Sequence, residues 1–148
     1  MSALRILPFD ATHVPAVANI ERLCFAAPWS EASLGLLLTG ENGGLTAIGG
    51  DGVVGYIGYL GVLDELEITN VAVHPDHRRQ GIGAALLGEL IARAERMGAV
   101  RITLDVRVSN VPAISLYEKF GFSPCGKRKG FYSAPKEDAI IMEWRGGK

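Results

Sequence analysis

The middle of the chain constrains the fold most, because it reads as a strand, a helix and a second strand in immediate succession. Residues 66–73 form a strand-like apolar run, and residues 83–97 repeat apolar side chains at helical spacing before Gly98. Residues 100–107 then alternate apolar and polar side chains, which is typical of a half-buried strand. Two strands joined through a helix run parallel, so we predict a right-handed crossover unit from Leu66 to Arg107.

The flanking segments predict further helices and mostly antiparallel strands, giving a mixed α/β fold. Asp-Gly between apolar runs favours a tight hairpin, and Asp, Thr, Ser or Asn before a helical pattern favours a cap. The expected elements are a strand over 3–7, a helix starting at Asp10 or Thr12, a helix capped by Ser30, a hairpin of 45–49 and 53–62 turning at Asp51-Gly52, a strand starting after the turn Asp64-Glu65, a helix from Asn110 to Phe120, and a strand over 136–144.

Composition points to one ordinary globular domain spanning residues 1–148. The chain has 148 residues, of which 48% are hydrophobic and 21% charged, and its net charge is −1. Without an overall basic field, direct nucleic-acid binding is not expected. The chain shows neither an export signal nor an apolar run long enough for a bilayer, and its two cysteines form no C-x-x-C pair. We therefore expect a cytoplasmic protein with reduced thiols and no membrane association.

The stretch VHPDHRRQGIGAALL, residues 73–87, predicts an anion site between the first strand and the helix. Backbone N–H groups at a helix N-terminus are unpaired and carry partial positive charge, so they suit a pyrophosphate. Gly81 and Gly83 allow close backbone approach, and Arg78 and Arg79 add charge. The alternative is a surface turn in which the glycines serve only the bend.

Two other phosphate-binding motifs fit this stretch less well. A P-loop requires G-x-x-x-x-G-K-[ST], which is absent. A Rossmann site gains some support from Asp105 on the following strand, but HPDHRRQ separates the first strand from the glycines, and Leu86 replaces the third glycine. His74 and His77 give H-x-x-H without further ligands in the pattern, so no metal is expected.

The sequence RRQGIGA, preceded by VAVHP, resembles the Q/R-x-x-G-x-G/A motif of the GNAT superfamily of N-acetyltransferases. This resemblance implies a GNAT-type sheet with helices on both faces and acetyl-CoA as the cosubstrate. It also implies that backbone groups of the strand bind the pantetheine arm and that the turn binds the pyrophosphate. The residues concerned are Val71, Ala72 and Val73 for the strand, and Arg78, Arg79, Gln80, Gly81, Ile82, Gly83 and Ala84 for the turn.

Longer segments resemble the RimI-type ribosomal-protein-alanine N-acetyltransferases. These segments are PWSE at 28–31, LDELEITNVAVHPDHRRQGIGAALL at 63–87, LDVRVSNVPAISLYEKFGF at 104–122 and EDAIIM at 137–142. The resemblance implies transfer of acetyl to the N-terminal amine of a small-subunit ribosomal protein. It also implies that Asn110 contacts the cofactor and that Tyr117 is the general acid that protonates the leaving thiolate.

The general base is where the sequence departs from this family. RimI-type enzymes carry glutamate in an L-E-V-R segment, whereas this chain has Asp105 there. Alternation places Asp105 on the polar face of its strand, and one methylene fewer shortens its reach by roughly 1.5 Å. Glu67 on the neighbouring strand is a second candidate base, and either carboxylate can instead be a solvated strand residue.

The basic and aromatic segment 127–142 matches the stretch that helps bind the acceptor peptide in RimI-type enzymes, although Phe131-Tyr132 replaces their Tyr-Tyr pair. An ordinary edge hairpin is the alternative. The whole sequence predicts direct acetyl transfer in a ternary complex, since neither cysteine lies in a recognisable nucleophile motif. An acetyltransferase for small-molecule amines and a CoA-binding module without turnover are the other hypotheses.

Overall fold

A computed structural model of the chain describes residues 4–50 and 52–146. Its seven strands form one sheet in the order β1-β2-β3-β4-β5-β7-β6, in which only β4 and β5 run parallel. The strands are β1 Arg5–Pro8, β2 Gly43–Gly49, β3 Gly52–Val62, β4 Glu65–Val73, β5 Arg101–Arg107, β6 Ser123–Tyr132 and β7 Glu137–Arg145. The helices are α1 Val14–Cys24, α2 Glu31–Leu34, α3 Ile82–Met97 and α4 Val111–Lys119, with 3₁₀ turns at Ala11–His13, Gly35–Leu38 and Pro75–His77.

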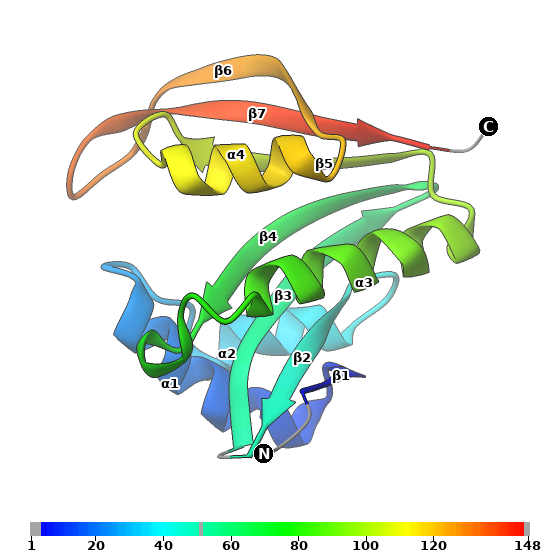
Figure 1. Cartoon of the computed structure of the whole chain (residues 1–148), viewed down its shortest axis with the longest axis vertical. Helices are drawn as coiled ribbons and strands as arrows, with labels where there is room; N and C mark the ends of the chain where they lie inside the picture. The colour runs from blue at the N-terminus through cyan, green and yellow to red at the C-terminus, as the bar shows by residue number, and fades with distance from the viewer. Residues whose placement is uncertain (1–3, 51, 147–148) are drawn as a thin grey trace.

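The predicted parallel unit and the mixed, mostly antiparallel sheet are confirmed. The parallel unit consists of the consecutive elements β4, α3 and β5. Within it, Glu65, Leu66 and Glu67 of β4 pair in parallel with the start of β5. Helices α3 and α4 cover one face of the sheet, while α1 and α2 lie behind its N-terminal half, strands β2 to β4 (Figure 1).

Several predicted boundaries shift slightly. Asp10, not Thr12, caps the first helical turn by accepting a hydrogen bond from the Thr12 backbone N–H at 2.8 Å. Strand β1 ends at Pro8, one residue beyond the predicted strand, and Ala3 lies outside the described residues, as does Asp51 of the predicted hairpin turn. Glu65 already belongs to β4 rather than to the preceding turn. Ser30, Asn110 and Gly98 cap their helices as predicted.

Apolar side chains fill both faces of the sheet. One cluster contains Leu86, Leu87 and Leu90 of α3, and the other, behind the sheet, contains Val17 and Ile20 of α1. Met97, which the helical pattern assigns to the apolar stripe, is 57% exposed because it lies in the last turn of α3, beyond the edge of the core. Both cysteines are free thiols, as expected.

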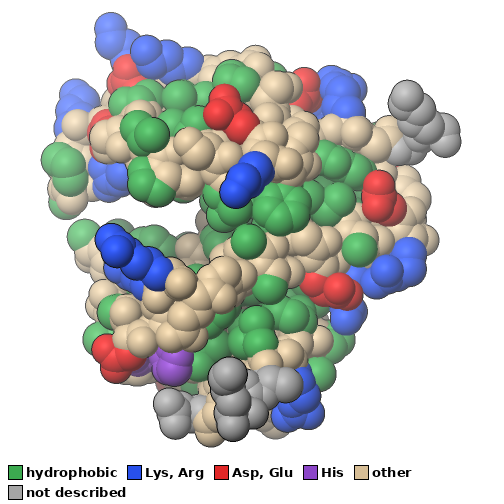
Figure 2. Space-filling model, viewed as in Figure 1, with side chains coloured by type: hydrophobic (Ala, Val, Ile, Leu, Met, Phe, Trp, Pro, Cys, Tyr) green, Lys and Arg blue, Asp and Glu red, His purple; other side chains and the backbone are tan. Residues whose placement is uncertain are grey.

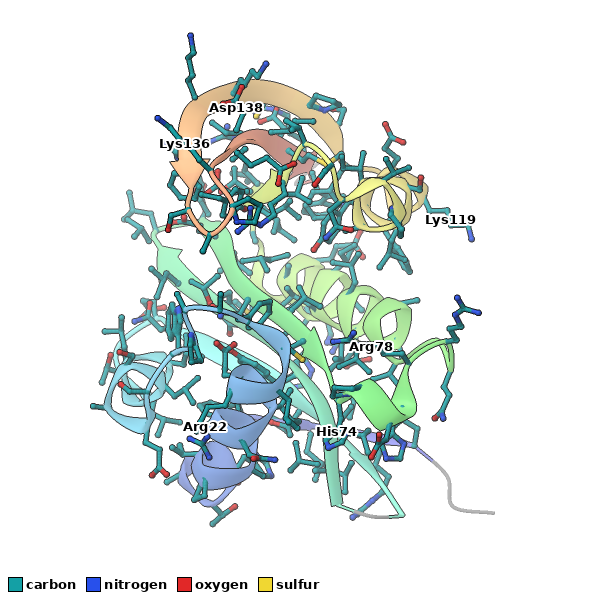
Figure 3. The ribbon with its side chains drawn as sticks, turned by 90° about the vertical axis from the view of Figure 1, so that its left-hand side faces the viewer. Arg22, His74, Arg78, Lys119, Lys136 and Asp138 are labelled. Carbon is teal, nitrogen blue, oxygen red and sulfur yellow. The ribbon has the colours of Figure 1, made fainter. Side chains whose placement is uncertain are left out.

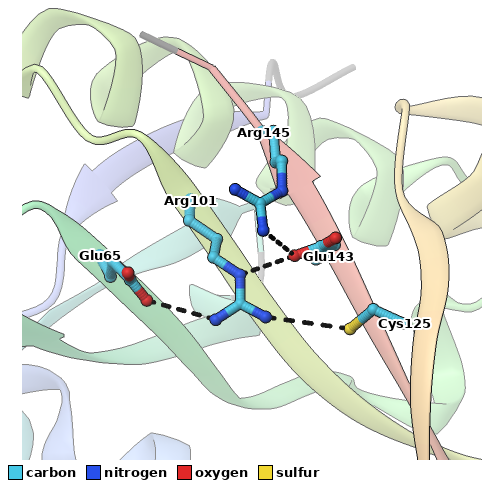
Figure 4. Close-up of polar contacts among 5 residues, drawn as sticks. All are labelled: Glu65, Arg101, Cys125, Glu143 and Arg145. Carbon is cyan, nitrogen blue, oxygen red and sulfur yellow. Dashed lines mark hydrogen bonds and ion pairs between the residues drawn. The ribbon is translucent and has the colours of Figure 1, made fainter.

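Strands β4 and β5 separate after three residue pairs, and this separation opens the molecule. The register between β3 and β4 shifts so that Thr69 is an extra residue on β4, which bends the strand. At the closed end, Arg101 of β5 binds Glu65 of β4 and Glu143 of β7, at 3.4 Å and 2.6 Å (Figure 4). Figure 2 shows the resulting hollow between the two halves of the sheet, with basic side chains at its rim.

Strand β6 was not predicted as a separate element. It lies at the edge of the sheet, and among its ten residues only Gly130 and Tyr132 are partly buried, while the other eight are exposed. Because both faces of the strand are exposed, its sequence shows no alternation of apolar and polar residues. With β7 it forms the edge hairpin that was one interpretation of residues 127–142. The described part of the chain contains no helix with the length and apolar character needed to cross a membrane.

Candidate active site

A cleft of about 450 Å³ lies where β4 and β5 separate. Five segments that are far apart in the sequence line it, so it exists only in the folded chain. They are the end of α1 and the loop after it (Glu21, Phe25, Ala26, Ala27, Trp29), β4 (Thr69, Asn70, Val71), the end of β5 and the loop after it (Asp105, Val106, Arg107, Asn110), Tyr117 of α4, and the end of β6 with the β6–β7 turn (Phe131, Tyr132, Ser133, Ala134).

Tyr117 lies in this cleft with only 9% of its surface exposed. Helix α4 places it against Phe122, with the two ring centres 5.8 Å apart. Burial, followed by the nearby Tyr132, raises the pKa of the Tyr117 hydroxyl to about 12. Tyr117 therefore keeps its proton at neutral pH, as a donor to a leaving group must.

Asp105 reaches the same cleft from β5. Its neighbours Leu104 and Val106 are buried on the opposite face of the strand, so the predicted polar-face placement of Asp105 is confirmed. The Asp105 side chain is 18% exposed, and one carboxylate oxygen accepts a hydrogen bond from Arg128 Nε of β6 at 3.0 Å. The carboxylate is thus held at the cleft by the edge strand β6, which lies beyond β7 in the sheet.

Glu67 lies outside the cleft. It is exposed and lines a smaller hollow of about 260 Å³ on the other side of Asp105, together with Thr103 and Arg128. Asp105 is the residue that the two hollows share. The structure therefore brings Asp105, but not Glu67, into one cleft with Tyr117.

The glycine turn has the geometry of an open helix N-terminus. Gly81 is the N-cap of α3 and adopts a left-handed conformation, with φ of 75°. A Cβ at Gly81 would meet no atom within 4 Å, so its backbone faces open space. Arg78, Arg79 and Gln80 are exposed around it, whereas the Ile82 side chain is buried and can offer a ligand only its backbone.

Arg78 folds back over the end of β4. Its Nη2 lies 3.3 Å from Cys24 Sγ, and its Nε donates to the Val73 carbonyl at 3.4 Å. Figure 3 shows Arg78 beside the start of α3, at the gap between the two halves. The Arg78 guanidinium therefore lies between β4 and the glycine turn, the two segments that the sequence analysis expects to bind the same cosubstrate.

Asn110 and His74 both have structural contacts. Asn110 Oδ1 accepts a hydrogen bond from the Ala113 backbone N–H at 3.3 Å and so caps α4 at the edge of the cleft. His74 Nδ1 accepts from the Asp76 backbone N–H at 3.1 Å, within the 3₁₀ turn before the glycines. In residues 4–50 and 52–146, no three His, Cys, Asp or Glu side chains are grouped as metal ligands.

The β6–β7 turn forms the second wall of the cleft, and Arg107 at the end of β5 holds it. Arg107 donates to the carbonyl oxygens of Pro135 and Ser133, at 2.9 Å and 3.1 Å, and pairs with Glu137 at 3.1 Å. Its guanidinium also lies 4.5 Å from the centre of the Tyr132 ring. The aromatic segment assigned to acceptor binding thus lies in the cleft wall.

Glu21 is a cleft residue that sequence reasoning missed. Its side chain is fully buried, at 0% exposure, and it accepts hydrogen bonds from Trp29, Tyr56 and Asn70. One signal was present: Glu21 follows Val17 by four residues and precedes Cys24 by three, so it lies on the buried side of α1. A carboxylate on that side implies a buried polar network.

The turn and β4 together fit acetyl-CoA. From Ile68 to Val73, β4 pairs with no described strand on the side facing β5. Apart from the Val73 carbonyl, which accepts from Arg78 and Cys24, this backbone edge is open to an amide-bearing arm. This edge leads to the helix N-terminus at Gly81, where backbone N–H groups suit a pyrophosphate.

This fold and cleft are those of an acetyltransferase: a model of the "Acetyltransferase (GNAT) family" matches residues 14–122, so the chain belongs to that family. It is an acetyl-CoA-dependent N-acetyltransferase. The chain is 39% identical to the ribosomal protein bS18-alanine N-acetyltransferase of Escherichia coli K12, over 93% of this chain and 94% of that protein. The Haemophilus influenzae protein of the same description is 32% identical over 93% of this chain and 95% of its own length.

Solved structures agree. The crystal structure of the ribosomal-protein-S18-alanine N-acetyltransferase from Escherichia coli superposes with a TM-score of 0.91 at 35% identity, over 97% of this chain and 94% of that one. Ard1 from Thermoplasma volcanium has a TM-score of 0.86 at 24% identity over 97% of both chains, which shows a shared fold.

Proposed function

We propose that this enzyme transfers acetyl from acetyl-CoA to the N-terminal α-amine of a protein, and that its acceptor is ribosomal protein bS18 with N-terminal alanine. The cleft at the separation of β4 and β5 carries the proposal, because it brings Asp105 and Tyr117 together between two walls. The printed activity of the relatives that match nearly the whole chain supports the acceptor. The enzyme works as one domain in the cytoplasm.

Acetyl-CoA binds from the α3 side. The β4 backbone over Val71, Ala72 and Val73 pairs with the pantetheine arm, and the turn from Arg78 to Ala84 binds the pyrophosphate, with Asn110 as a further contact. The acceptor then approaches between the loop after α1 and the β6–β7 turn, which are the two walls of the same cleft.

Asp105 accepts a proton from the acceptor amine, directly or through water. The amine nitrogen bonds to the thioester carbonyl carbon, the C–S bond breaks, and Tyr117 donates its proton to the departing sulfur. An α-amine with pKa near 8 is already roughly a tenth neutral at pH 7, so a weak base suffices. Of the two cysteines, neither lines the cleft among the described residues, which supports transfer without an acyl-enzyme.

The test is acetyl-CoA consumption with three kinds of acceptor: peptides with free N-terminal alanine, the same peptides with a blocked N-terminus, and free lysine or polyamines. The proposal expects activity with the first kind and its loss on blocking. Activity with the small amines alone would overturn the acceptor assignment, and acetyl-CoA binding without transfer to any of these amines would contradict it as well.

A further inference from the structure

The buried carboxylate of Glu21 joins three elements at the floor of the cleft. Its Oε1 accepts from the Trp29 backbone N–H at 2.8 Å, which fixes the loop after α1. Its Oε2 accepts from the Tyr56 hydroxyl of β3 at 2.5 Å and from Asn70 Nδ2 of β4 at 2.8 Å. The mechanism above gives this carboxylate no chemical step.

The chemistry of a carboxylate sets the orientation of Asn70. Asn70 turns its NH₂ group toward Glu21, because its Nδ2 donates to Oε2, the oxygen that also accepts from Tyr56. The Asn70 carbonyl oxygen therefore points away from this network. If the group at Glu21 could both donate and accept, Asn70 could face it with either its NH₂ group or its carbonyl oxygen.

The Asn70 carbonyl oxygen is shielded from solvent, yet no described residue donates a hydrogen bond to it. Asn70 itself lines the cleft and is partly exposed there, next to the bulged residue Thr69. A buried acceptor without a donor is unfavourable, and such groups are uncommon in folded proteins. The missing donor fits an N–H group of a molecule bound at the floor of the cleft.

We propose that Glu21 is a positioning residue for the acceptor: it holds the Asn70 carboxamide so that its oxygen accepts a hydrogen bond from the acceptor amine. This inference rests on the proposed function, since it places the amine between Asn70 and Asp105. An amine has several N–H groups, so Asp105 can take one proton while Asn70 accepts a hydrogen bond from another. Asn70 then helps to orient the amine for attack.

Substitution of Glu21→Gln tests the orientation with little change of shape. The glutamine oxygen can still accept from Trp29, but its NH₂ group replaces Oε2 and donates. Asn70 must then turn its oxygen inward and present its NH₂ group to a donor amine. Asn70→Leu removes the same oxygen at similar volume. Tyr56→Phe is the matched control, because it removes a hydrogen bond from the same carboxylate oxygen and leaves Asn70 oriented.

The measurements are the KM for a peptide with N-terminal alanine, the Kd for acetyl-CoA, and the Ki of the same peptide lacking its α-amino group. We expect Glu21→Gln and Asn70→Leu each to raise the KM about tenfold, as for loss of one hydrogen bond to a polar or charged group. The acetyl-CoA Kd and the Ki of the desamino peptide should stay within about twofold, because neither involves the amine. Tyr56→Phe should lower the melting temperature and leave the KM unchanged.

An equal rise of KM and desamino Ki in Glu21→Gln, or an equal rise of KM in Tyr56→Phe, would make the network purely structural and overturn the inference. A wild-type enzyme that uses only small amines would instead refute the proposed acceptor. In that case the KM of the same variants for the amine that is used would still decide the role of Asn70, so the two failures are distinguishable.

Discussion

In the proposed mechanism Tyr117 is the proton donor, and its raised pKa of about 12 keeps the hydroxyl protonated. Replacing it with phenylalanine removes the donor and keeps the ring that packs against Phe122. We expect Tyr117→Phe to lower kcat by about 10²-fold or more, the range of general acid catalysis, with the Kd for acetyl-CoA unchanged. Tyr59→Phe, a half-buried tyrosine outside the cleft, is the control and should leave kcat unchanged. An unaltered kcat in Tyr117→Phe would make Tyr117 structural.

The same hydroxyl shapes the expected pH dependence. Burial raises the pKa of Tyr117 to about 12, so the acid form persists well above neutral pH. The acceptor α-amine has a pKa near 8 and becomes reactive as it loses its proton. We therefore expect kcat/KM to rise with pH to about 8 and then to stay level to about pH 10. A fall between pH 8 and 9.5 that disappears in Tyr117→Phe would show that Tyr117 titrates lower.

Two carboxylates on neighbouring strands offer a direct comparison of candidate bases. Asp105 lines the cleft with Tyr117, while Glu67 lies in the adjoining hollow. Asp105→Asn should lower kcat/KM for the peptide by about 10²-fold, near the low end for general base catalysis, whereas Glu67→Gln should stay within about twofold. Steady-state rates of the two variants, measured side by side, decide the question. A larger loss in Glu67→Gln would reverse the assignment.

At the scale of elements, helix α3 has left-handed glycines at both ends. Gly81 begins it with φ of 75°, Gly98 ends it with φ of 80°, and a Cβ at either would meet no atom within 4 Å. A side chain at either position is therefore strained, by about 1–2 kcal/mol or more, without a clash inside the protein. Gly81→Val and Gly98→Val should consequently lower the melting temperature by similar amounts.

Only Gly81→Val should impair cofactor binding, because its Cβ would occupy the space where the pyrophosphate approaches the backbone. We expect its Kd for acetyl-CoA to rise at least about tenfold, while that of Gly98→Val stays near the wild-type value; titration calorimetry measures both. Equal affinities in the two variants would remove the turn from the binding site.

Elements that carry a local signal were predictable from the sequence. Alternation identified β5, helical spacing with Gly98 identified α3, and Asn110 identified the start of α4. Strand β6 gave no such signal, since nearly all of its side chains are exposed. The bulge at Thr69 could not be predicted either, because it depends on the pairing register between β4 and β3. Local pattern predicts an element only where its burial is periodic.

For the molecule as a whole, the cleft results from several long-range contacts. The separation of β4 and β5, the wall held by Arg107 and the network around Glu21 each join segments distant in the sequence. Asp105 and Tyr117 were found as candidates one at a time, and only the fold puts them in one cleft and leaves Glu67 outside. The Glu21 network escaped prediction because its partners Tyr56 and Asn70 come from two other strands.

The central claim is that the folded enzyme selects an N-terminal α-amine. One peptide with N-terminal alanine and an internal lysine, incubated with the enzyme and acetyl-CoA at pH 7, offers both amines at equal concentration. The lysine amine has a pKa near 10.4 and is a few hundredfold less often neutral than the α-amine. Fragment mass spectrometry of the product should place the acetyl group on the α-nitrogen alone. Acetyl on the lysine side chain with the N-terminus left free would contradict the account.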